Sequence, residues 1–243
     1  MGVIRQLGKA FLSACLPASR LLVHGRVVGR GVRPALALTF DDGPDPVHTP
    51  RLLDECARAG FRATFFVLGK KVAAQPDLAR RIVAEGHELG NHTWSHADPA
   101  LIGAADFLKE VEDTALLLQD VCGIDCRLTR PPNGKLTWGK MRGLWRLGQT
   151  VALWNVDSKD YCMSDARQMQ DWCAGYRPRH GDILLFHDNH PFAEVALQDM
   201  HQRGVFSRFA GVAISEWLAG DSIANPGAAT VIPTAPIGER PHG

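Results

Sequence analysis

Two adjacent aspartates, Asp41 and Asp42, follow an apolar run in LTFDDGPDPVHTP, residues 38–50. A turn needs only one such side chain, and adjacent like charges repel each other. The pair therefore suggests two carboxylates with different tasks. One task would be to hold a cation, and the other would be to move a proton.

The segment HTWSH places His92 and His96 four residues apart. On a helical turn this spacing brings both imidazoles to one side, as a metal pair requires. A third ligand from Asp41 or Asp42 would complete a site of two histidines and one carboxylate, with open positions for water. The other carboxylate would then be free to act as a base toward that water.

Titratable residues also end other apolar runs: His92 follows the third, Arg130 the fourth, Asp157 the fifth and His187 the sixth. Ligand sites of parallel α/β folds lie at the carboxyl ends of strands. We therefore expect these groups to share one rim of a sheet.

The elements that must position these groups alternate along the chain. Strands are expected at residues 35–42, 62–69, 87–92, 126–132, 150–157, 181–188 and near 205–210. Helices are expected at residues 47–59, 76–86, 103–121, 137–147, 164–176, 193–203 and near 212–218. Alternation over this length predicts a mostly parallel sheet with helices outside, open or closed into a barrel.

The composition suits one large domain. The chain has 243 residues, of which 45% are apolar and 22% charged, and its net charge is +1. There is no basic excess that would favour nucleic acid or an anionic membrane, and no apolar run approaches the ~20 residues that span a bilayer. We expect a catalytic domain at 33–218 and a flexible, proline-containing tail at 219–243.

Residues 1–32 form a separate N-terminal segment in this interpretation. Its short apolar stretch, residues 10–18, follows Arg5 and Lys9. It is interpreted as a helix, with a weak signal or anchor as the alternative, because the run LSAC resembles a bacterial lipoprotein cleavage box. A cytoplasmic or membrane-peripheral location in a bacterium is favoured over export.

The six cysteines form no CxxC pair and do not suggest a zinc ribbon or a dense disulfide scaffold. Most are expected to be small buried hydrophobes. Cys122 and Cys126 are close enough in sequence for a bridge, although nothing demands one.

Five motifs in order give the chain a family resemblance. It resembles polysaccharide deacetylases of the NodB-homology type, carbohydrate esterase family 4, from about residue 33 to 218. The motifs are TFDDGP (39–44), HTWSH (92–96), RPPNG (130–134), WNVDSKDY (154–161) and ILLFH (183–187).

The resemblance implies a distorted (β/α) barrel that holds a divalent metal, most often zinc, in a groove. It implies removal of acetyl groups, usually from N-acetylglucosamine units of chitin oligomers, peptidoglycan or exopolysaccharide. It also implies roles for individual residues: Asp41 as the base, Arg130 as its partner, Asp42, His92 and His96 as metal ligands, His187 as the acid, Asp157 as the group that tunes His187, and the backbone N–H of Asn133 as an oxyanion donor.

Two positions depart from the family pattern. Asn133 stands where the third motif usually has Tyr, and Tyr161 stands where the fourth usually has Trp. Both changes bear on sugar packing rather than on metal chemistry. Asp160 is expected to be structural, and His48, Asp188 and His190 have no assigned role.

The expected function is metal-dependent hydrolysis of N-acetyl groups on an acetylated glycan, with acetate as a product. An O-acetyl esterase on the same site is the enzymatic alternative. A catalytically silent glycan-binding relative is a third reading, but such a protein would be expected to have lost a ligand or the base. A zincin-like peptidase needs His-Glu-x-x-His, and Thr93 stands where that Glu would be.

Overall fold

The computed structural model describes residues 21–23 and 33–218. Its strands are β1 (Leu21–Leu22), β2 (Ala35–Gly43), β3 (Ala63–Val67), β4 (Glu88–Asn91), β5 (Leu128–Thr129), β6 (Thr150–Ala152), β7 (Val156–Asp157), β8 (Ile183–His187) and β9 (Ala210–Gly211). Its helices are α2 (His48–Ala59), α3 (Gly69–Ala74), α4 (Pro76–Ala84), α5 (Ala104–Cys122), α6 (Trp138–Arg146), α7 (Ala166–Gly175), α8 (Phe192–Gln202), α9 (Val205–Arg208) and α10 (Ile214–Leu218), with 3-10 turns η1 (Pro132–Gly134) and η2 (Asp160–Cys162).

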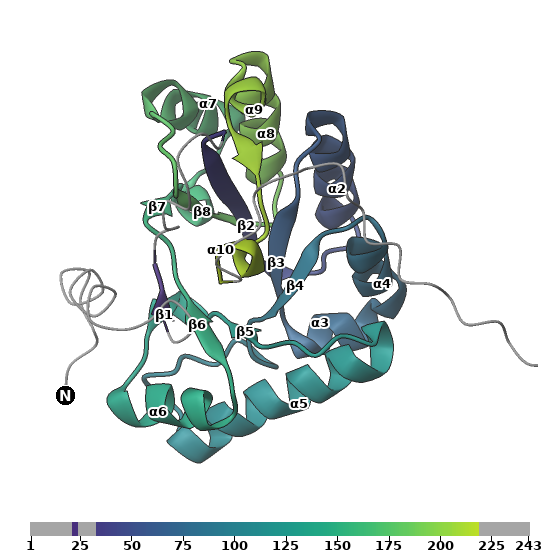
Figure 1. The fold of residues 1–243 in the computed structure, drawn as a ribbon, viewed down its shortest axis with the longest axis vertical. Helices are drawn as coiled ribbons and strands as arrows, with labels where there is room; N and C mark the ends of the chain where they lie inside the picture. Colours follow the sequence, from purple (N-terminus) through teal and green to yellow (C-terminus); the bar gives the residue numbers. More distant parts are fainter. Residues whose placement is uncertain (1–20, 24–32, 219–243) are drawn as a thin grey trace, which may run out of the picture.

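The strands form one curled parallel sheet in the order β1-β6-β5-β4-β3-β2-β8-β7, and β9 pairs with β2. Helices surround this sheet on the outside (Figure 1). The barrel is open between its edge strands β1 and β7, and the chain passes from one edge to the other between β6 and β7. Leu153 N–H donates to Leu22 on one edge (2.8 Å), and Asn155 N–H donates to Ile183 beside the other (3.3 Å).

Alternation along β2 separates the two faces of the sheet. Leu36, Leu38 and Phe40 point outward into the core that the surrounding helices cover. Ala35 and Ala37 belong to the core inside the barrel. Because side chains alternate with a period of two, the next inward positions are Thr39 and Asp41. The strand pattern thus delivers Asp41 to the barrel interior at the carboxyl end of β2.

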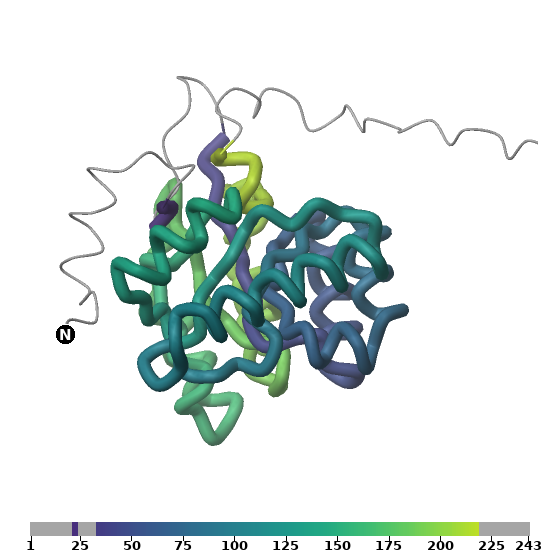
Figure 2. The backbone as a smooth tube through the Cα atoms, turned by 90° about the horizontal axis from the view of Figure 1, so that it is seen from below, coloured from purple at the N-terminus to yellow at the C-terminus, as the bar shows by residue number. Residues whose placement is uncertain are grey.

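The inner core is closed at the amino ends of the strands by α10. Ile214 and Trp217 of α10 pack with the inner residue Phe66, and the Ile214 N–H donates to Thr64 Oγ1 at 3.0 Å. In Figure 2 the start of β2 and α10 lie at one end of the barrel, and the green loop after β7 lies at the other. The carboxyl ends of the strands therefore face away from α10.

Glycines in the left-handed region stop two of the covering helices. Gly60 (φ 63°) follows α2 and Gly123 (φ 69°) follows α5, and each N–H donates to a carbonyl of the last helical turn.

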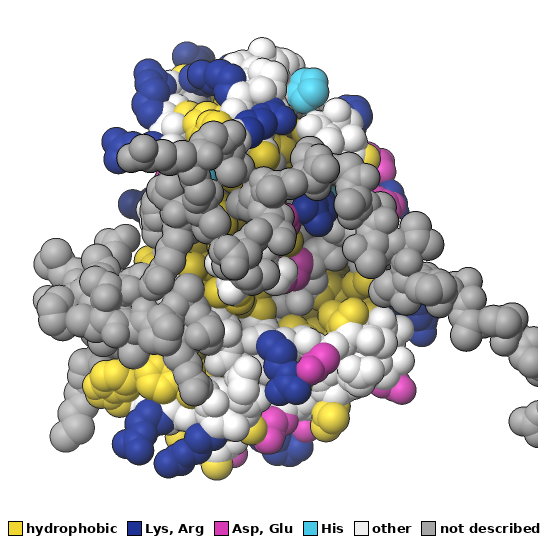
Figure 3. All heavy atoms as spheres, viewed as in Figure 1, with side chains coloured by type: hydrophobic (Ala, Val, Ile, Leu, Met, Phe, Trp, Pro, Cys, Tyr) yellow, Lys and Arg dark blue, Asp and Glu magenta, His cyan; other side chains and the backbone are white. Residues whose placement is uncertain are grey.

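On the face in Figure 3, basic and acidic side chains both occur among the described residues. Within the described residues, no helix has the length and apolar character needed to cross a bilayer.

The expected alternation of strands and helices is confirmed, with four differences. Residues 150–157 form two strands because the chain changes neighbours at the barrel opening. The strand expected near 205–210 begins only at Ala210, as β9, because residues 205–208 form α9, whose Phe206 packs on Phe61 at 4.5 Å between ring centroids. Helix α3 was not expected, and Leu21–Leu22, assigned to the N-terminal segment, join the sheet.

The other terminal expectations lie outside the described residues, namely those for 1–20, 24–32 and the tail 219–243. Cys122 and Cys126 are free thiols, as are the other three cysteines that the structure describes. The bridge that the sequence allowed is therefore not formed.

Gly90→Ala should destabilise the fold, because a Cβ at Gly90 would lie 2.5 Å from the ring of Phe66. Overpacking of this kind costs about 1–3 kcal/mol. Gly175→Ala is the matched control, since a Cβ there meets no atom within 4 Å. Urea unfolding of both variants checks this, and equal stabilities would contradict the packing argument.

Candidate active site

The two aspartates diverge because β2 has an irregularity at Asp42. The register with β3 shifts between Asp41 and Gly43, and Asp42 has φ 76°. Bulges next to active sites commonly re-aim a side chain. Asp41 stays in register, faces inward and is 3% exposed. Asp42 faces a different set of neighbours, so the adjacent carboxylates occupy separate environments.

Arg130 is fully buried and holds Asp41. Its Nη1 donates to Asp41 Oδ1 at 2.7 Å and to Thr39 Oγ1 at 2.7 Å. The remaining donors reach the carbonyls of Ala152 and Leu153, at 3.3 and 3.1 Å. Burial lowers the pKa of Arg130, and the charge of Asp41 opposes this effect. The guanidinium therefore depends on Asp41 for compensation of its charge.

A candidate metal centre is formed by Asp42, His92 and His96. Asp42 Oδ1 lies 3.5 Å from His92 Nε2 and 3.3 Å from His96 Nε2. Two ligands at tetrahedral angles around zinc are about 3.3–3.5 Å apart, given zinc–ligand distances of about 2.0–2.2 Å. Both distances from Asp42 Oδ1 therefore match the spacing of a ligand set.

Hydrogen bonding prepares the same three residues for a cation. His92 Nδ1 lies 2.8 Å from the carbonyl oxygen of Arg130, which can only accept, so Nδ1 carries the proton and Nε2 keeps its lone pair. Burial lowers the pKa of His92, against the charges of Asp41 and Asp42, and favours the neutral ring. Asp42 Oδ1 is buried and has no hydrogen-bond donor within the described residues. A divalent metal fits this donor set.

The two imidazoles of HTWSH do not meet on a helical turn. Residues 92–96 follow β4 as a loop in which Thr93 (φ 70°) and His96 (φ 64°) are left-handed. The loop is fixed from the side by Glu110 of α5, which accepts from the N–H and the hydroxyl of Ser95 at 3.1 and 2.6 Å. The histidines converge because of this loop rather than because of helical spacing.

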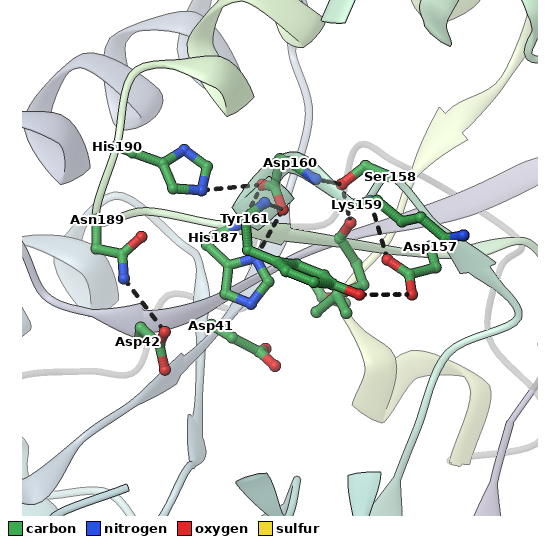
Figure 4. A network of polar contacts seen from close by, with 12 residues as sticks. Asp41, Asp42, Asp157, Ser158, Lys159, Asp160, Tyr161, His187, Asn189 and His190 are labelled. Atoms are coloured by element: carbon green, nitrogen blue, oxygen red, sulfur yellow. Dashed lines mark hydrogen bonds and ion pairs between the residues drawn. The ribbon is translucent and has the colours of Figure 1, made fainter. Parts of the chain in front are cut away.

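His187 ends β8 and pairs with Asp160. Its Nδ1 lies 2.7 Å from Asp160 Oδ1, and its backbone N–H donates to Asp160 Oδ2 at 2.7 Å (Figure 4). Burial alone would lower the pKa of His187. The hydrogen bond and charge of Asp160, with the charges of Asp41 and Asp42, outweigh burial and raise the pKa to about 9. The ring is therefore protonated at neutral pH.

The structure corrects the assignment of Asp157 as the partner of His187, because Asp160 occupies that place. Asp157 accepts instead from the Lys159 N–H at 2.9 Å and from the Tyr161 hydroxyl at 3.5 Å. Lys159 is left-handed (φ 56°), and η2 begins directly after it, so Asp160 turns inward and is fully buried. The two aspartates of DSKD are equivalent by sequence, and only this turn distinguishes them.

The other predicted positions flank these groups. The Tyr161 ring meets the His187 ring edge-on at 5.4 Å between centroids and is 55% exposed. Asn133 is exposed and left-handed (φ 56°) in η1, three residues after Arg130. Sequence reasoning assigned no role to Asn189, whose Nδ2 donates to Asp42 Oδ2 at 3.2 Å. The one feature of the sequence that could have indicated a role for Asn189 is its position in the loop directly after the ILLFH motif.

The base and acid candidates are direct neighbours across the sheet. Asp41 of β2 and His187 of β8 are register partners. The same strand end carries Asp42, so the candidate metal ligands lie next to both. The site thus combines a carboxylate, a protonated imidazole and a set of candidate metal ligands at the carboxyl ends of parallel strands in an open barrel.

Comparison with known proteins identifies the class to which this barrel and site belong. The sequence model of the family described as "Polysaccharide deacetylase" matches residues 29–152, about half of the chain. The chitooligosaccharide deacetylase of Sinorhizobium fredii is 36% identical over 168 residues, which are 68% of this chain and 77% of that protein. The chain belongs to the polysaccharide deacetylase family.

A solved structure supports the same conclusion at the level of the fold. The peptidoglycan deacetylase PdaC of Bacillus subtilis superposes with a TM-score of 0.71 at 30% identity, covering 77% of this chain and 91% of that one. The curated Bacillus subtilis protein, named a peptidoglycan-N-acetylmuramic acid deacetylase, is 35% identical over 153 residues. The match covers 63% of this chain and 32% of that protein, about a third of its length.

Arg130→Met should destabilise the protein by about 3–5 kcal/mol, because it leaves the buried Asp41 without its cation. Arg81→Met is the matched control: Arg81 is 38% exposed and pairs with Asp54 and Glu85 at the surface. Its loss should change stability by no more than about 1 kcal/mol. Denaturant unfolding of the two variants gives the difference, and similar losses would contradict a special role for the Arg130 pair.

Proposed function

We propose that the protein is a zinc-dependent hydrolase that removes N-acetyl groups from N-acetylglucosamine units of an oligosaccharide or polysaccharide. The observation that carries this proposal is the register pair of Asp41 and His187 beside the ligand set of Asp42, His92 and His96. A mixed nitrogen and oxygen donor set suits zinc. The names of the family and of its similar members support an acetylated glycan as substrate.

A cation held by Asp42, His92 and His96 would polarise the acetyl carbonyl and lower the pKa of water. Asp41 receives the proton of the attacking water while the water oxygen bonds to the carbonyl carbon. Its Oδ1 is occupied by Arg130, so Oδ2 is the atom available for this proton. Arg130 also fixes the orientation of the Asp41 carboxylate, because the guanidinium is hydrogen-bonded to β2 through Thr39 and to β6 through Ala152.

His187 acts at the opposite step. Its Nδ1 is bonded to Asp160, so Nε2–H is the proton that it can donate to the departing amine nitrogen. Donation accompanies cleavage of the carbon–nitrogen bond and leaves acetate and the free amino sugar. An amine is a poor leaving group without a proton, and the raised pKa of His187 keeps that proton available. This favours an amide substrate over an ester.

Two further roles follow from the family pattern. The Asn133 N–H is proposed as a donor to the tetrahedral oxyanion, and loss of one such donor typically costs ~10²–10³ in rate. Tyr161 is proposed as a flat contact for the sugar, since its exposed ring stands over His187. Neither residue binds the metal in this scheme.

Acetate release from chitooligosaccharides, peptidoglycan and acetylated xylan tests the activity directly. We expect release from an N-acetylated substrate, loss with chelator and recovery with zinc. Asp41→Asn should lower turnover by ~10²–10⁴ while its zinc content stays unchanged, because the ligands are intact. Release from xylan alone would favour the O-acetyl esterase, and full activity of Asp41→Asn would exclude this base.

The alkaline limb of the pH profile reports His187, whose proton is lost as pH rises through about 9. Asp160→Asn removes the charge that raises this pKa, so the limb should move to lower pH by about 1–3 units. Asp157→Asn is the control because, within the described residues, the hydrogen bonds of Asp157 go to Lys159 and Tyr161 rather than to His187. A shift in the Asp157 variant, with none in the Asp160 variant, would reverse the assignment.

A further inference from the structure

A second group of metal-binding side chains lies beside the candidate acid. The His190 cluster consists of Asp160, His187 and His190, with one ligand atom from each residue lying within 4.8 Å of the others. It shares no residue with the set formed by Asp42, His92 and His96. Figure 4 shows His187 and His190 approaching Asp160 from different sides.

His190 is the unexplained member of this cluster. Both of its ring nitrogens are buried and have no hydrogen-bond partner within the described residues. Burial without a partner costs free energy, so such a polar group calls for a role. Its Nε2 points toward Asp160 Oδ2 at 3.7 Å, too far for a hydrogen bond. The side chain is held by its neighbours, with the Phe192 ring at 5.1 Å between centroids.

The spacing of the His190 cluster is close to that of a zinc site. Zinc ligands at tetrahedral angles are about 3.3–3.5 Å apart, and His190 Nε2 and Asp160 Oδ2 are 3.7 Å apart. His187 Nδ1 is 2.7 Å from Asp160 Oδ1, so these two atoms must separate slightly for a cation to enter. Two imidazoles and one carboxylate make a borderline donor set that prefers zinc to magnesium or calcium.

We propose that the His190 cluster is a second, weaker Zn²⁺ site, and that its occupation inhibits the enzyme. The cation accepts lone pairs from His190 Nε2, His187 Nδ1 and an Asp160 oxygen, and the proton on His187 Nδ1 passes to solvent. A neutral ring with zinc on Nδ1 keeps an Nε2–H, but that group is a much weaker acid than an imidazolium. Excess zinc therefore removes the proton donor while the first site stays filled.

The site is weaker than the first because zinc must compete there with a proton. The first set has its spacing ready and an unpartnered Asp42 Oδ1. In the second, the hydrogen bond between His187 and Asp160 must be broken before both atoms can act as ligands. Binding should therefore tighten as pH rises, since ligands must be deprotonated.

Zinc titration of the metal-free protein tests the site without reference to any substrate. Calorimetry with Zn²⁺ should show two affinity classes in the wild type. His190→Gln should keep the first class and weaken the second by at least the ~10–100-fold that follows loss of a partner of a metal ligand. His92→Ala should lose the first class and keep the second.

The matched control is His201→Gln, which removes an exposed histidine of α8 outside the cluster. It should bind zinc as the wild type does. Retention of the first class in His190→Gln also shows that this variant is folded, and His190→Asn provides an independent second variant. Zinc bound elsewhere on the chain affects all these proteins equally and cancels in the comparison.

Inhibition is the second arm, and it rests on the proposed function. With the substrate identified by acetate release, activity should rise with the first equivalent of zinc and fall as the weaker site fills. In His190→Gln the fall should require at least tenfold more zinc. A single class in the wild type, or an unchanged second class in His190→Gln, would overturn the site. Two classes without inhibition would overturn only the inhibitory role.

Discussion

The buried ion pair between Arg130 and Asp41 is the interaction on which the rest of the site depends. Arg130 joins β2, through Thr39 and Asp41, to the carbonyls of residues 152 and 153 at the barrel opening. Its own carbonyl fixes the His92 ring. A guanidinium with no exposed surface is tolerated only when its charge and donors are satisfied. The orientation of Asp41, the tautomer of His92 and the tie between β2 and the end of β6 are therefore coupled through one residue.

Charge is distributed in the site so that two like groups do not compete. Asp41 faces a permanent cation, whereas Asp42 faces His96 and the Nε2 of His92, which keeps its lone pair. The same logic applies on the other strand, where the Asp160 carboxylate keeps His187 cationic. Each of these carboxylates thus has its own set of partner groups, so the candidate base, the candidate metal ligands and the candidate acid can lie close together.

The sequence predicted the fold class and the rim of polar residues because both follow from local periodicity and from the direction of parallel strands. The sequence-based predictions were wrong where the conformation of a loop determines which side chains meet. The convergence of His92 and His96 depends on left-handed residues after β4, and the choice of Asp160 over Asp157 depends on the left-handed Lys159. Non-glycine residues with positive φ are uncommon, and the local amino-acid sequence does not predict where they occur. The short helix α9 was missed because its apolar residues fit a strand equally well.

The register between Asp41 and His187 has a consequence for how this fold diversifies. Neighbouring strands are held about 4.8 Å apart by main-chain hydrogen bonds, so the separation of the two strand ends is a property of the backbone ladder. Substitutions in side chains cannot easily change it. The loops that carry Asn133 and Tyr161 are under no such constraint. Substitutions confined to those loops would therefore alter the surface beside the site while the spacing of the strand ends that carry Asp41 and His187 stays constant.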